Sequence, residues 1–211
     1  MSYVIKKSFS ECCSLLKRIY LPVILSLISF GLSAGGNAIV GEKKAVICIE
    51  CHGIDGATED PIVPKLNGQY EEFLYEQVMQ YLTGDRFDTV MGKVVNKVKP
   101  STQDIEDIAA YYSKLPMMSG NGVLTDVGKR GQDIFFRRQC NFCHNDHDDS
   151  VNIYIRKTAR VGGQNKEYLY KSLKDIQDGI RRADEFNLME RILKQLTDDE
   201  IDALAEFVSS L

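Results

Sequence analysis

The sequence predicts an all-α protein made of two tandem copies of one small helical unit behind an N-terminal export segment. Three observations support this prediction. The chain matches itself at an offset of 95 to 96 residues, apolar side chains recur at helical rather than strand spacing, and each copy contains one Cys-X-X-Cys-His motif. Hydrophobic residues make up 44% of the 211 residues, which is typical of a folded protein. The 30 acidic and 26 basic residues argue against a dedicated nucleic-acid-binding protein.

Residues 1–38 have the features of a secretory signal peptide. Four basic residues and one acidic residue precede an apolar run at residues 21–32, and small residues follow at 33–38. This run is shorter than the roughly 18–20 residues that a membrane-spanning helix needs. We therefore expect a protein that is exported to the periplasm.

The sequence leaves the processing site open. Cleavage after Ala34 and cleavage after Ala38 both satisfy the requirement for small residues. An uncleaved anchor with peripheral membrane association is the alternative, because residues 19–41 carry no charge. Cleavage removes Cys12 and Cys13, together with four basic residues and one acidic residue, and changes the net charge from −4 to −7.

The remaining four cysteines lie in two motifs that predict covalent haem attachment. These are Cys48-Ile49-Glu50-Cys51-His52 and Cys140-Asn141-Phe142-Cys143-His144. Two thiols at this spacing can form thioethers to the two vinyl groups of one haem, and the adjoining histidine can bind the iron. A zinc ribbon would need about 15–20 residues between its cysteine pairs, whereas 88 residues separate these. A thioredoxin-like site would need a βαβ context, and a pair of disulfides would leave both histidines unexplained.

The internal repeat suggests a second axial ligand for each haem. Between a repeated Gly-X-Arg element and the last helix, each copy has one methionine, Met91 in the first and Met189 in the second. Met189 is the only methionine after the second motif, and the repeat gives Met91 the equivalent role. We therefore predict His52 and Met91 as iron ligands in one copy, and His144 and Met189 in the other.

Four other residues are less suitable as iron ligands. Met79 lies in the middle of an expected helix and has no counterpart in the second copy, and Met117 and Met118 lie beyond the terminal helix of the first. His147 is only three residues from His144, which is too close to reach the opposite face of the haem. We expect His147 to be a loop residue.

Helix patterns follow the repeat in order. An amphipathic helix is expected at 70–82, ending at Gly84, and its counterpart at 168–176 ends at Gly179. Capping boxes start at Ser101 and Thr197 and introduce the last helix of each copy. The predicted domains are residues 39–115 and 128–211, joined by a linker at 116–127, where Pro, Ser and Gly gather around 116–122.

With these motifs in place, the chain resembles the dihaem cytochrome c4 family over nearly all of the mature sequence. The first copy follows the family pattern in order, with Cys48 to Gly53, Pro64-X-Leu66-X-Gly68-Gln69, Gly84-X-Arg86 and Met91. In the second copy the glycine after the haem histidine is Asn145 and the proline is Ala159. In class I cytochromes the proline carbonyl accepts a hydrogen bond from the haem histidine, and Ala159 retains a carbonyl for it.

The resemblance implies two class I cytochrome c folds that carry one electron at a time from a cytochrome bc complex toward a terminal oxidase. His/Met ligation suits this role because it leaves no open coordination position. The alternatives are a dihaem subunit of a flavocytochrome c sulfide dehydrogenase-like complex and an enzyme of the dihaem peroxidase or thiosulfate-oxidising type. Peroxidase chemistry needs an accessible sixth position on the iron, which the paired methionines disfavour.

Charge and arginine placement give two further hypotheses. Residues 39–115 have a net charge of −5 and residues 116–211 a net charge of −2, so the first copy could steer toward a basic partner surface. Arg86 and Arg181 follow a helix-ending glycine in both copies, where they could pair with haem propionates or form surface salt bridges.

Overall fold

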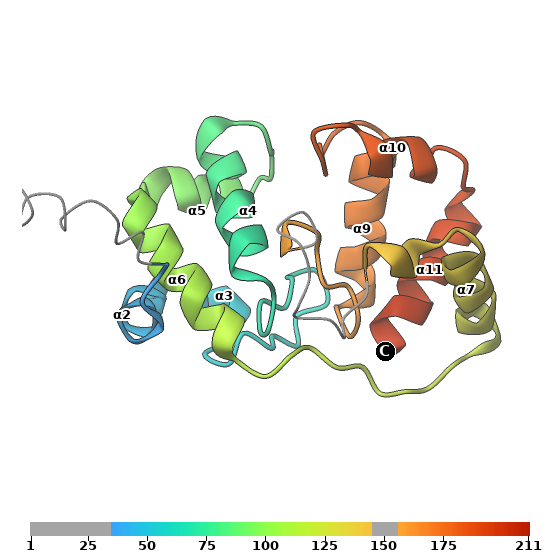
Figure 1. Ribbon diagram of the computed structural model, residues 1–211, viewed down its shortest axis with the longest axis horizontal. Coiled ribbons are helices and arrows are strands. Elements are labelled where there is room, and N and C mark those ends of the chain that lie inside the picture. The colour runs from blue at the N-terminus through green and yellow to red at the C-terminus, as the bar shows by residue number, and fades with distance from the viewer. Residues whose placement is uncertain (1–34, 145–155) are drawn as a thin grey trace, which may run out of the picture. The chain divides into compact units, whose positions relative to one another are not determined.

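Helices are the only extended regular elements in residues 35–144 and 156–211, which are the residues that this computed structural model describes (Figure 1). Residues 1–34, which make up most of the predicted signal peptide 1–38, and His147 lie outside the described residues. In the first half the helices are α2 (Ala38–Lys44), α3 (Val46–His52), α4 (Glu71–Thr83), α5 (Met91–Val98) and α6 (Thr102–Lys114). In the second half they are α7 (Asp126–Arg137), the 3₁₀ turn η1 (Cys140–Phe142), α9 (Lys166–Gln177), α10 (Leu188–Leu193) and α11 (Asp198–Ser210). The all-α prediction is confirmed.

The first and last helices of each half cross closely, and a glycine makes each crossing possible. A Cβ atom on Gly41 of α2 would lie 1.8 Å from the Asp107 carbonyl oxygen of α6. A Cβ atom on Gly131 of α7 would lie 1.8 Å from the Ala203 carbonyl oxygen of α11. No larger side chain fits at either point. In both halves, therefore, the first helix packs against the last through a glycine that contacts a backbone carbonyl.

The helix boundaries follow the local signals in the sequence. Thr197 and Ser101 each accept a hydrogen bond from the N–H three residues ahead, and both complete a capping box with the acidic side chain at that position. Helix α4 ends at Gly84 in the left-handed conformation, with φ at 82°. The second capping box contains Glu200, whereas the first uses Asp104.

Each half has its own apolar core. The second core is the larger, and the rings of Phe135 on α7 and Phe207 on α11 meet edge to face with centroids 5.4 Å apart. The first core is built around Leu74 of α4 and Ala109 and Tyr112 of α6. A unit of this length buries little apolar surface by itself, so a bound group is expected to add to its stability.

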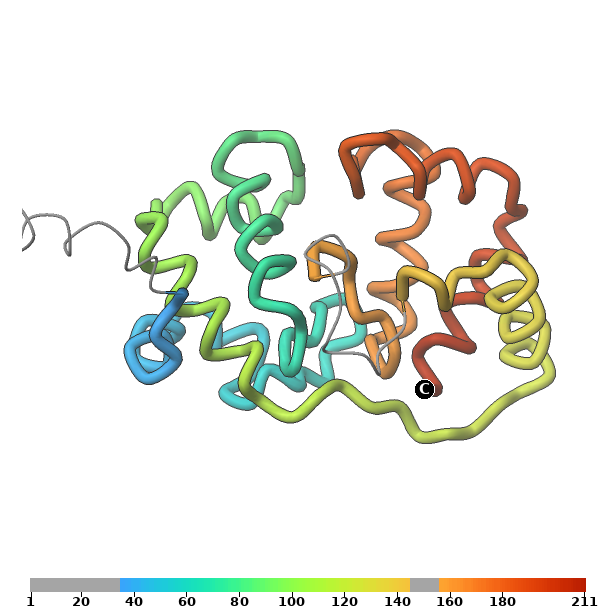
Figure 2. Tube along the Cα trace, viewed as in Figure 1, coloured from blue at the N-terminus to red at the C-terminus, as the bar shows by residue number. Residues whose placement is uncertain are grey.

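The chain between α6 and α7 forms no helix and passes along both halves (Figure 2). The domain bounds 39–115, 116–127 and 128–211 stay a prediction, because these residues belong to one compact unit from Gly35 to Leu211. Among the described residues, no helix has the length and apolar character to cross a membrane.

Candidate functional site

The first Cys-X-X-Cys-His motif lies entirely on helix α3, at its C-terminal end. Cys48 is half-buried, Cys51 is exposed, and neither forms a disulfide. His52 closes the helix and is only 6% exposed, so its ring points into the protein.

One hydrogen bond fixes the orientation of the His52 ring. Its Nδ1 lies 2.8 Å from the carbonyl oxygen of Pro64. A carbonyl oxygen only accepts hydrogen bonds, so Nδ1 carries the proton and the lone pair of Nε2 is left for a metal. Burial lowers the pKa of His52, against the opposing effect of the Pro64 contact, and keeps the ring neutral, as a ligand must be.

The first thiol of each motif, Cys48 and Cys140, lacks the lowered pKa of thiols that take part in disulfide exchange. Burial raises the pKa of Cys48 to about 11, with a smaller contribution from the neighbouring Cys51. Burial also raises the pKa of Cys140 in the second motif. Redox-active thiols of the Cys-X-X-Cys type have lowered rather than raised pKa values. In the described part of the chain, the cysteines are also not gathered into a metal site with each other or with acidic side chains.

The second motif repeats the arrangement on a different local scaffold. Cys140 begins the 3₁₀ turn η1 instead of lying on an α-helix, and Cys143 and His144 come directly after that turn. The Nδ1 of His144 lies 2.9 Å from the carbonyl oxygen of Ala159. The acceptor is a backbone oxygen in both halves. The hydrogen bond therefore forms with Ala159 in the second half as it does with Pro64 in the first.

Met91 and Met189 occupy equivalent places in the two halves. Met91 is the first residue of α5, and its N–H donates to Asp88 Oδ1 at 2.8 Å. Met189 lies in the first turn of α10, and its N–H donates to Asp184 Oδ2 at 3.0 Å. An aspartate therefore fixes the start of each methionine-bearing helix, a contact that no sequence motif predicts.

The other three methionines of the described residues lie away from the starts of α5 and α10. Met79 lies within α4, as expected. Met117 and Met118 lie in the segment between the halves, where their sulfur atoms accept hydrogen bonds from Arg160 and Gln164. Their thioethers are thus engaged in contacts between the two halves.

Arg86 and Arg181 lie side by side, joined by an isolated antiparallel bridge between their backbones. Both guanidinium groups donate to Gln77 Oε1 at 2.7 Å, and Arg86 also donates to the Tyr168 hydroxyl at 3.2 Å. Among the described residues, neither guanidinium forms an ion pair with a carboxylate, and Arg181 also donates to the Ser172 hydroxyl. Burial opposes ionisation of Tyr168, but Arg181 and Arg86 outweigh it and lower the pKa of this phenol to about 7.

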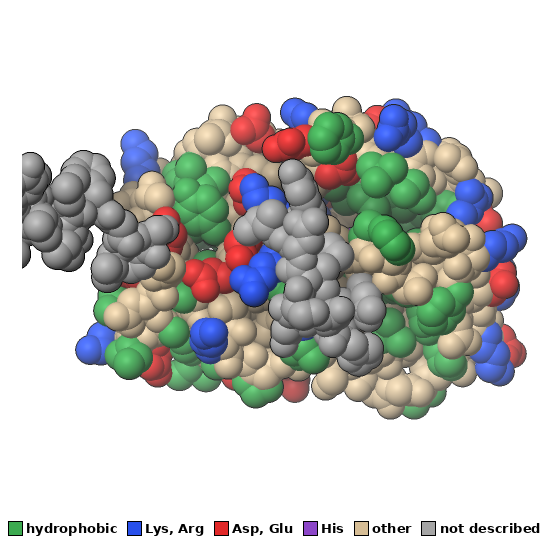
Figure 3. Space-filling model, in the orientation of Figure 1, with side chains coloured by type: hydrophobic (Ala, Val, Ile, Leu, Met, Phe, Trp, Pro, Cys, Tyr) green, Lys and Arg blue, Asp and Glu red, His purple; other side chains and the backbone are tan. Residues whose placement is uncertain are grey.

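Several features fit a large planar group with an apolar face in each half. The Tyr112 hydroxyl is buried without a hydrogen-bond partner among the described residues, close to Cys48. Large apolar side chains are exposed beside the two methionine helices: Phe87, Val90, Ile180, Phe186 and Leu188. Apolar surface is visible in both halves on the face drawn in Figure 3. A bound haem would cover such surface.

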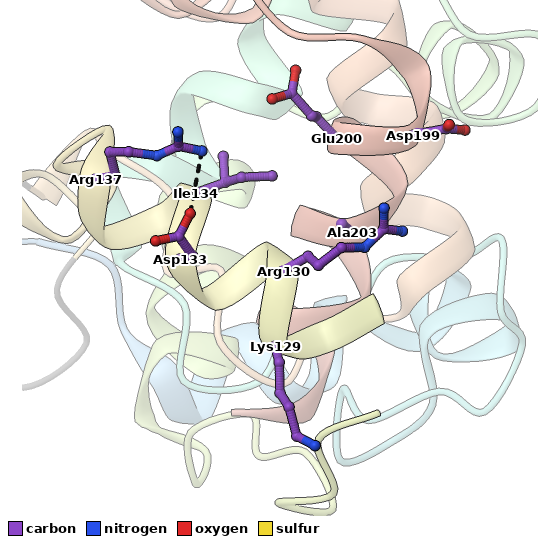
Figure 4. Close-up of a pocket in the computed structure, with 8 residues that line it drawn as sticks. All are labelled: Lys129, Arg130, Asp133, Ile134, Arg137, Asp199, Glu200 and Ala203. Carbon is purple, nitrogen blue, oxygen red and sulfur yellow. Dashed lines mark ion pairs between the residues drawn. The ribbon is translucent and has the colours of Figure 1, made fainter. Parts of the chain in front are cut away.

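A separate groove between α7 and α11 does not belong to either site (Figure 4). Charged side chains line it, including Arg137 and Asp133, which form an ion pair at 3.2 Å. No residue of either Cys-X-X-Cys-His motif lines this groove.

Comparison with known proteins also indicates a c-type cytochrome with two haem sites. The family model for cytochrome c matches residues 128–211. Cytochrome c4 of Pseudomonas aeruginosa is 31% identical over 205 residues, which covers 93% of this chain and all of the relative. A thiosulfate dehydrogenase electron acceptor of Thiomonas intermedia is 28% identical over 92% of this chain and 94% of the relative. The crystal structure of reduced cytochrome c4 from Pseudomonas stutzeri superposes with a TM-score of 0.72 at 30% identity, and covers 83% of this chain and 99% of that chain.

Proposed function

The chain belongs to the dihaem cytochrome c4 family, and on this basis we propose that it carries single electrons in the periplasm from a cytochrome bc complex toward a terminal oxidase. It holds two covalently attached haem c groups, one in each half. The observation that carries the proposal is the repeated pairing of a Cys-X-X-Cys-His histidine with a backbone carbonyl, His52 with Pro64 and His144 with Ala159.

The proposed attachment residues are Cys48 and Cys51 in the first half and Cys140 and Cys143 in the second. The proposed axial ligands are His52, Met91, His144 and Met189. Haem iron with His/Met ligation supplies reversible one-electron chemistry at a raised potential. The chain's own part is to hold each imidazole in one tautomer, to place each thioether at the start of a helix, and to keep water away.

We propose that Arg86 and Arg181 face the haem propionates. Their two positive charges are held side by side by Gln77 without a carboxylate partner among the described residues, and such an arrangement favours an anionic group nearby. The lowered pKa of Tyr168 reports the same local excess of positive charge.

Of the two processing sites, we propose cleavage after Ala34. The Gly36 N–H donates to Glu71 Oε1 at 3.0 Å, and the Asn37 side chain caps α2. Cleavage after Ala38 would remove this cap and the residues that hold it.

A second electron donor is suggested by one relative. The protein of Thiomonas intermedia is named as the electron acceptor of thiosulfate dehydrogenase. A sulfur-compound dehydrogenase is therefore the second candidate donor, in place of the bc complex. Rapid mixing of the oxidised protein with each purified donor separates these two routes, because the true donor reduces it at the higher rate.

Intact-protein mass spectrometry and an optical spectrum of the exported protein test the proposal together. We expect a chain that begins at Gly35 with the mass of two added haems, and a ferric spectrum that is low-spin with the weak sulfur-to-iron charge-transfer band. One haem per chain, or high-spin iron at either site, would show that the assignment is wrong.

A further inference from the structure

The repeated Gly-Gln element places two buried glutamines at the contact between the halves. Gln69 of the first half accepts a hydrogen bond from the Arg160 N–H at 2.9 Å and donates to the Arg160 carbonyl at 3.0 Å. Gln164 of the second half accepts from the Lys65 N–H at 2.8 Å and donates to the Lys65 carbonyl at 2.9 Å. Each glutamine thus pairs with both backbone groups of one residue in the other half.

The peptide groups held in this way are the same ones that orient the haem histidines. The Pro64–Lys65 peptide accepts from His52 Nδ1 through its oxygen and donates to Gln164 through its N–H. The Ala159–Arg160 peptide accepts from His144 Nδ1 and donates to Gln69. A continuous chain of two hydrogen bonds therefore links each histidine to the glutamine of the opposite half.

Hydrogen bonds in such a chain strengthen one another. A peptide whose N–H donates to an amide oxygen is polarised, so its carbonyl becomes a better acceptor. A stronger bond at Nδ1 makes the imidazole a more basic ligand, which favours the ferric state. Gln69 is 3% exposed and Gln164 is 5% exposed, so water has little access to replace either bond.

We propose that Gln69 lowers the redox potential of the haem bound by His144, and that Gln164 lowers that of the haem bound by His52. This inference rests on the proposed ligand roles of the two histidines. Both glutamines are positioning residues, since they act through a peptide group and a histidine. Each half would thereby tune the redox centre of the other.

We call each chain of two hydrogen bonds from a histidine to a glutamine a relay. The two relays do not depend equally on their glutamines. Pro64 has a fixed φ angle, so its carbonyl direction is partly set without the glutamine. Ala159 lacks that constraint, and Gln69 supplies the second anchor for its peptide. We expect the loss of Gln69 to have the larger effect.

The competing interpretation is that the glutamines only join the two halves. Asn165 provides a matched control for it, because its Nδ2 donates across the same contact to the carbonyls of Val63 at 2.8 Å and Asp60 at 3.0 Å. Neither carbonyl accepts from a haem histidine. Asn165→Ala therefore weakens the contact and leaves both relays intact.

The test uses the exported protein with both haems and the variants Gln69→Leu, Gln164→Leu and Asn165→Ala. The potential of each haem is measured by titration followed by NMR, with each haem assigned through its axial histidine, and the Nδ1–H chemical shift of that histidine is read in parallel. Gln69→Leu should raise the potential of the haem at His144 and weaken the hydrogen bond at its Nδ1. Gln164→Leu should do the same at His52 to a smaller extent, and Asn165→Ala should change neither haem.

A conservative variant keeps the test decisive if Gln69→Leu folds poorly. Gln69→Glu retains an oxygen acceptor for the Arg160 N–H but loses the amide donor, so the potential at His144 should stay or fall, opposite to the leucine variant. Equal shifts at both haems, or shifts no larger than those of Asn165→Ala, would overturn the relay. Loss of histidine ligation in the unmodified protein would instead contradict the proposed function.

Discussion

At the scale of single residues, the two haem sites depend on contacts that tolerate sequence change unequally. The contact at Nδ1 of each histidine is made to a backbone oxygen, so it is kept both with Pro64 and with Ala159. The proposed methionine ligand is a side chain without a substitute in the second half, because Met189 is the only methionine after the second Cys-X-X-Cys-His motif. The methionines are therefore the more informative positions to change.

Replacement of Met189 by alanine should affect one haem only. We expect the sulfur-to-iron charge-transfer band of the ferric protein to fall to about half, because one of two thioether ligands is lost, and the potential of that haem to fall. Optical and redox titrations measure both effects. Met79→Leu is the control and should leave the band unchanged, whereas an unchanged band in the Met189 variant would remove this residue from the ligand set.

At the scale of secondary-structure elements, a buried carboxylate holds the first helix of the fold. Asp107 on α6 accepts from the Asn37 N–H at 2.8 Å, from Lys44 Nζ at 2.6 Å and from Gln103 Nε2 at 3.1 Å. Its side chain is only 4% exposed. Asp107 therefore connects both ends of α2 to α6, beside the helix that carries the first haem motif.

Asp107→Asn should destabilise the protein by about 1–3 kcal/mol, the usual cost of removing one partner from buried charged hydrogen bonds. The Lys44 hydrogen bond, followed by the Asn37 N–H, lowers the pKa of Asp107 below its ordinary value of 3.8. Its contribution is therefore complete above about pH 4 and is lost as the pH falls through the lower folded-state pKa.

Denaturant unfolding of both proteins between pH 2 and pH 7 measures this difference. The difference in the free energy of unfolding between wild type and Asp107→Asn should disappear only at the acidic end of this range. Asp126→Asn is the matched control, since the Asp126 side chain is 97% exposed and pairs with the exposed Lys129 on the helix surface. A gap that is constant over the whole range would show that the charge of Asp107 does not matter.

At the scale of the whole molecule, charge differs between the halves. The first half carries −5 and the second −2. A net negative charge attracts a positively charged partner surface over a long range. This attraction raises the association rate and is screened by salt. We keep the hypothesis that the first half meets a basic surface on the redox partner.

The rate of electron transfer to the partner should fall about tenfold as ionic strength rises from low to high. Stopped-flow measurements at several salt concentrations give this slope. Glu59→Lys, an exposed change in the first half, should flatten the slope more than Glu185→Lys, an exposed change in the second. A rate that ignores ionic strength would rule out steering.

Much of the fold was predictable because its signals are local. The capping boxes at Ser101 and Thr197 and the glycine at 84 each involve residues within a few positions, so they can be recognised in the sequence. The short helices α5 and α10 were not predicted. They depend on Asp88 and Asp184, whose contacts with the following residues have different spacing in the two halves.

The sequence by itself determined the helical class, the duplication and the two haem signatures, since covalent attachment requires thiols and a histidine at one fixed spacing. Only the tertiary structure decided what the repeated glutamines contact. Gln69 and Gln164 bind backbone groups 91 and 99 residues away, and such partners depend on how the halves pack. A backbone partner carries no side-chain signature. No pattern in the sequence could therefore have indicated that a glutamine of each half bonds to the peptide that holds the motif histidine of the other half.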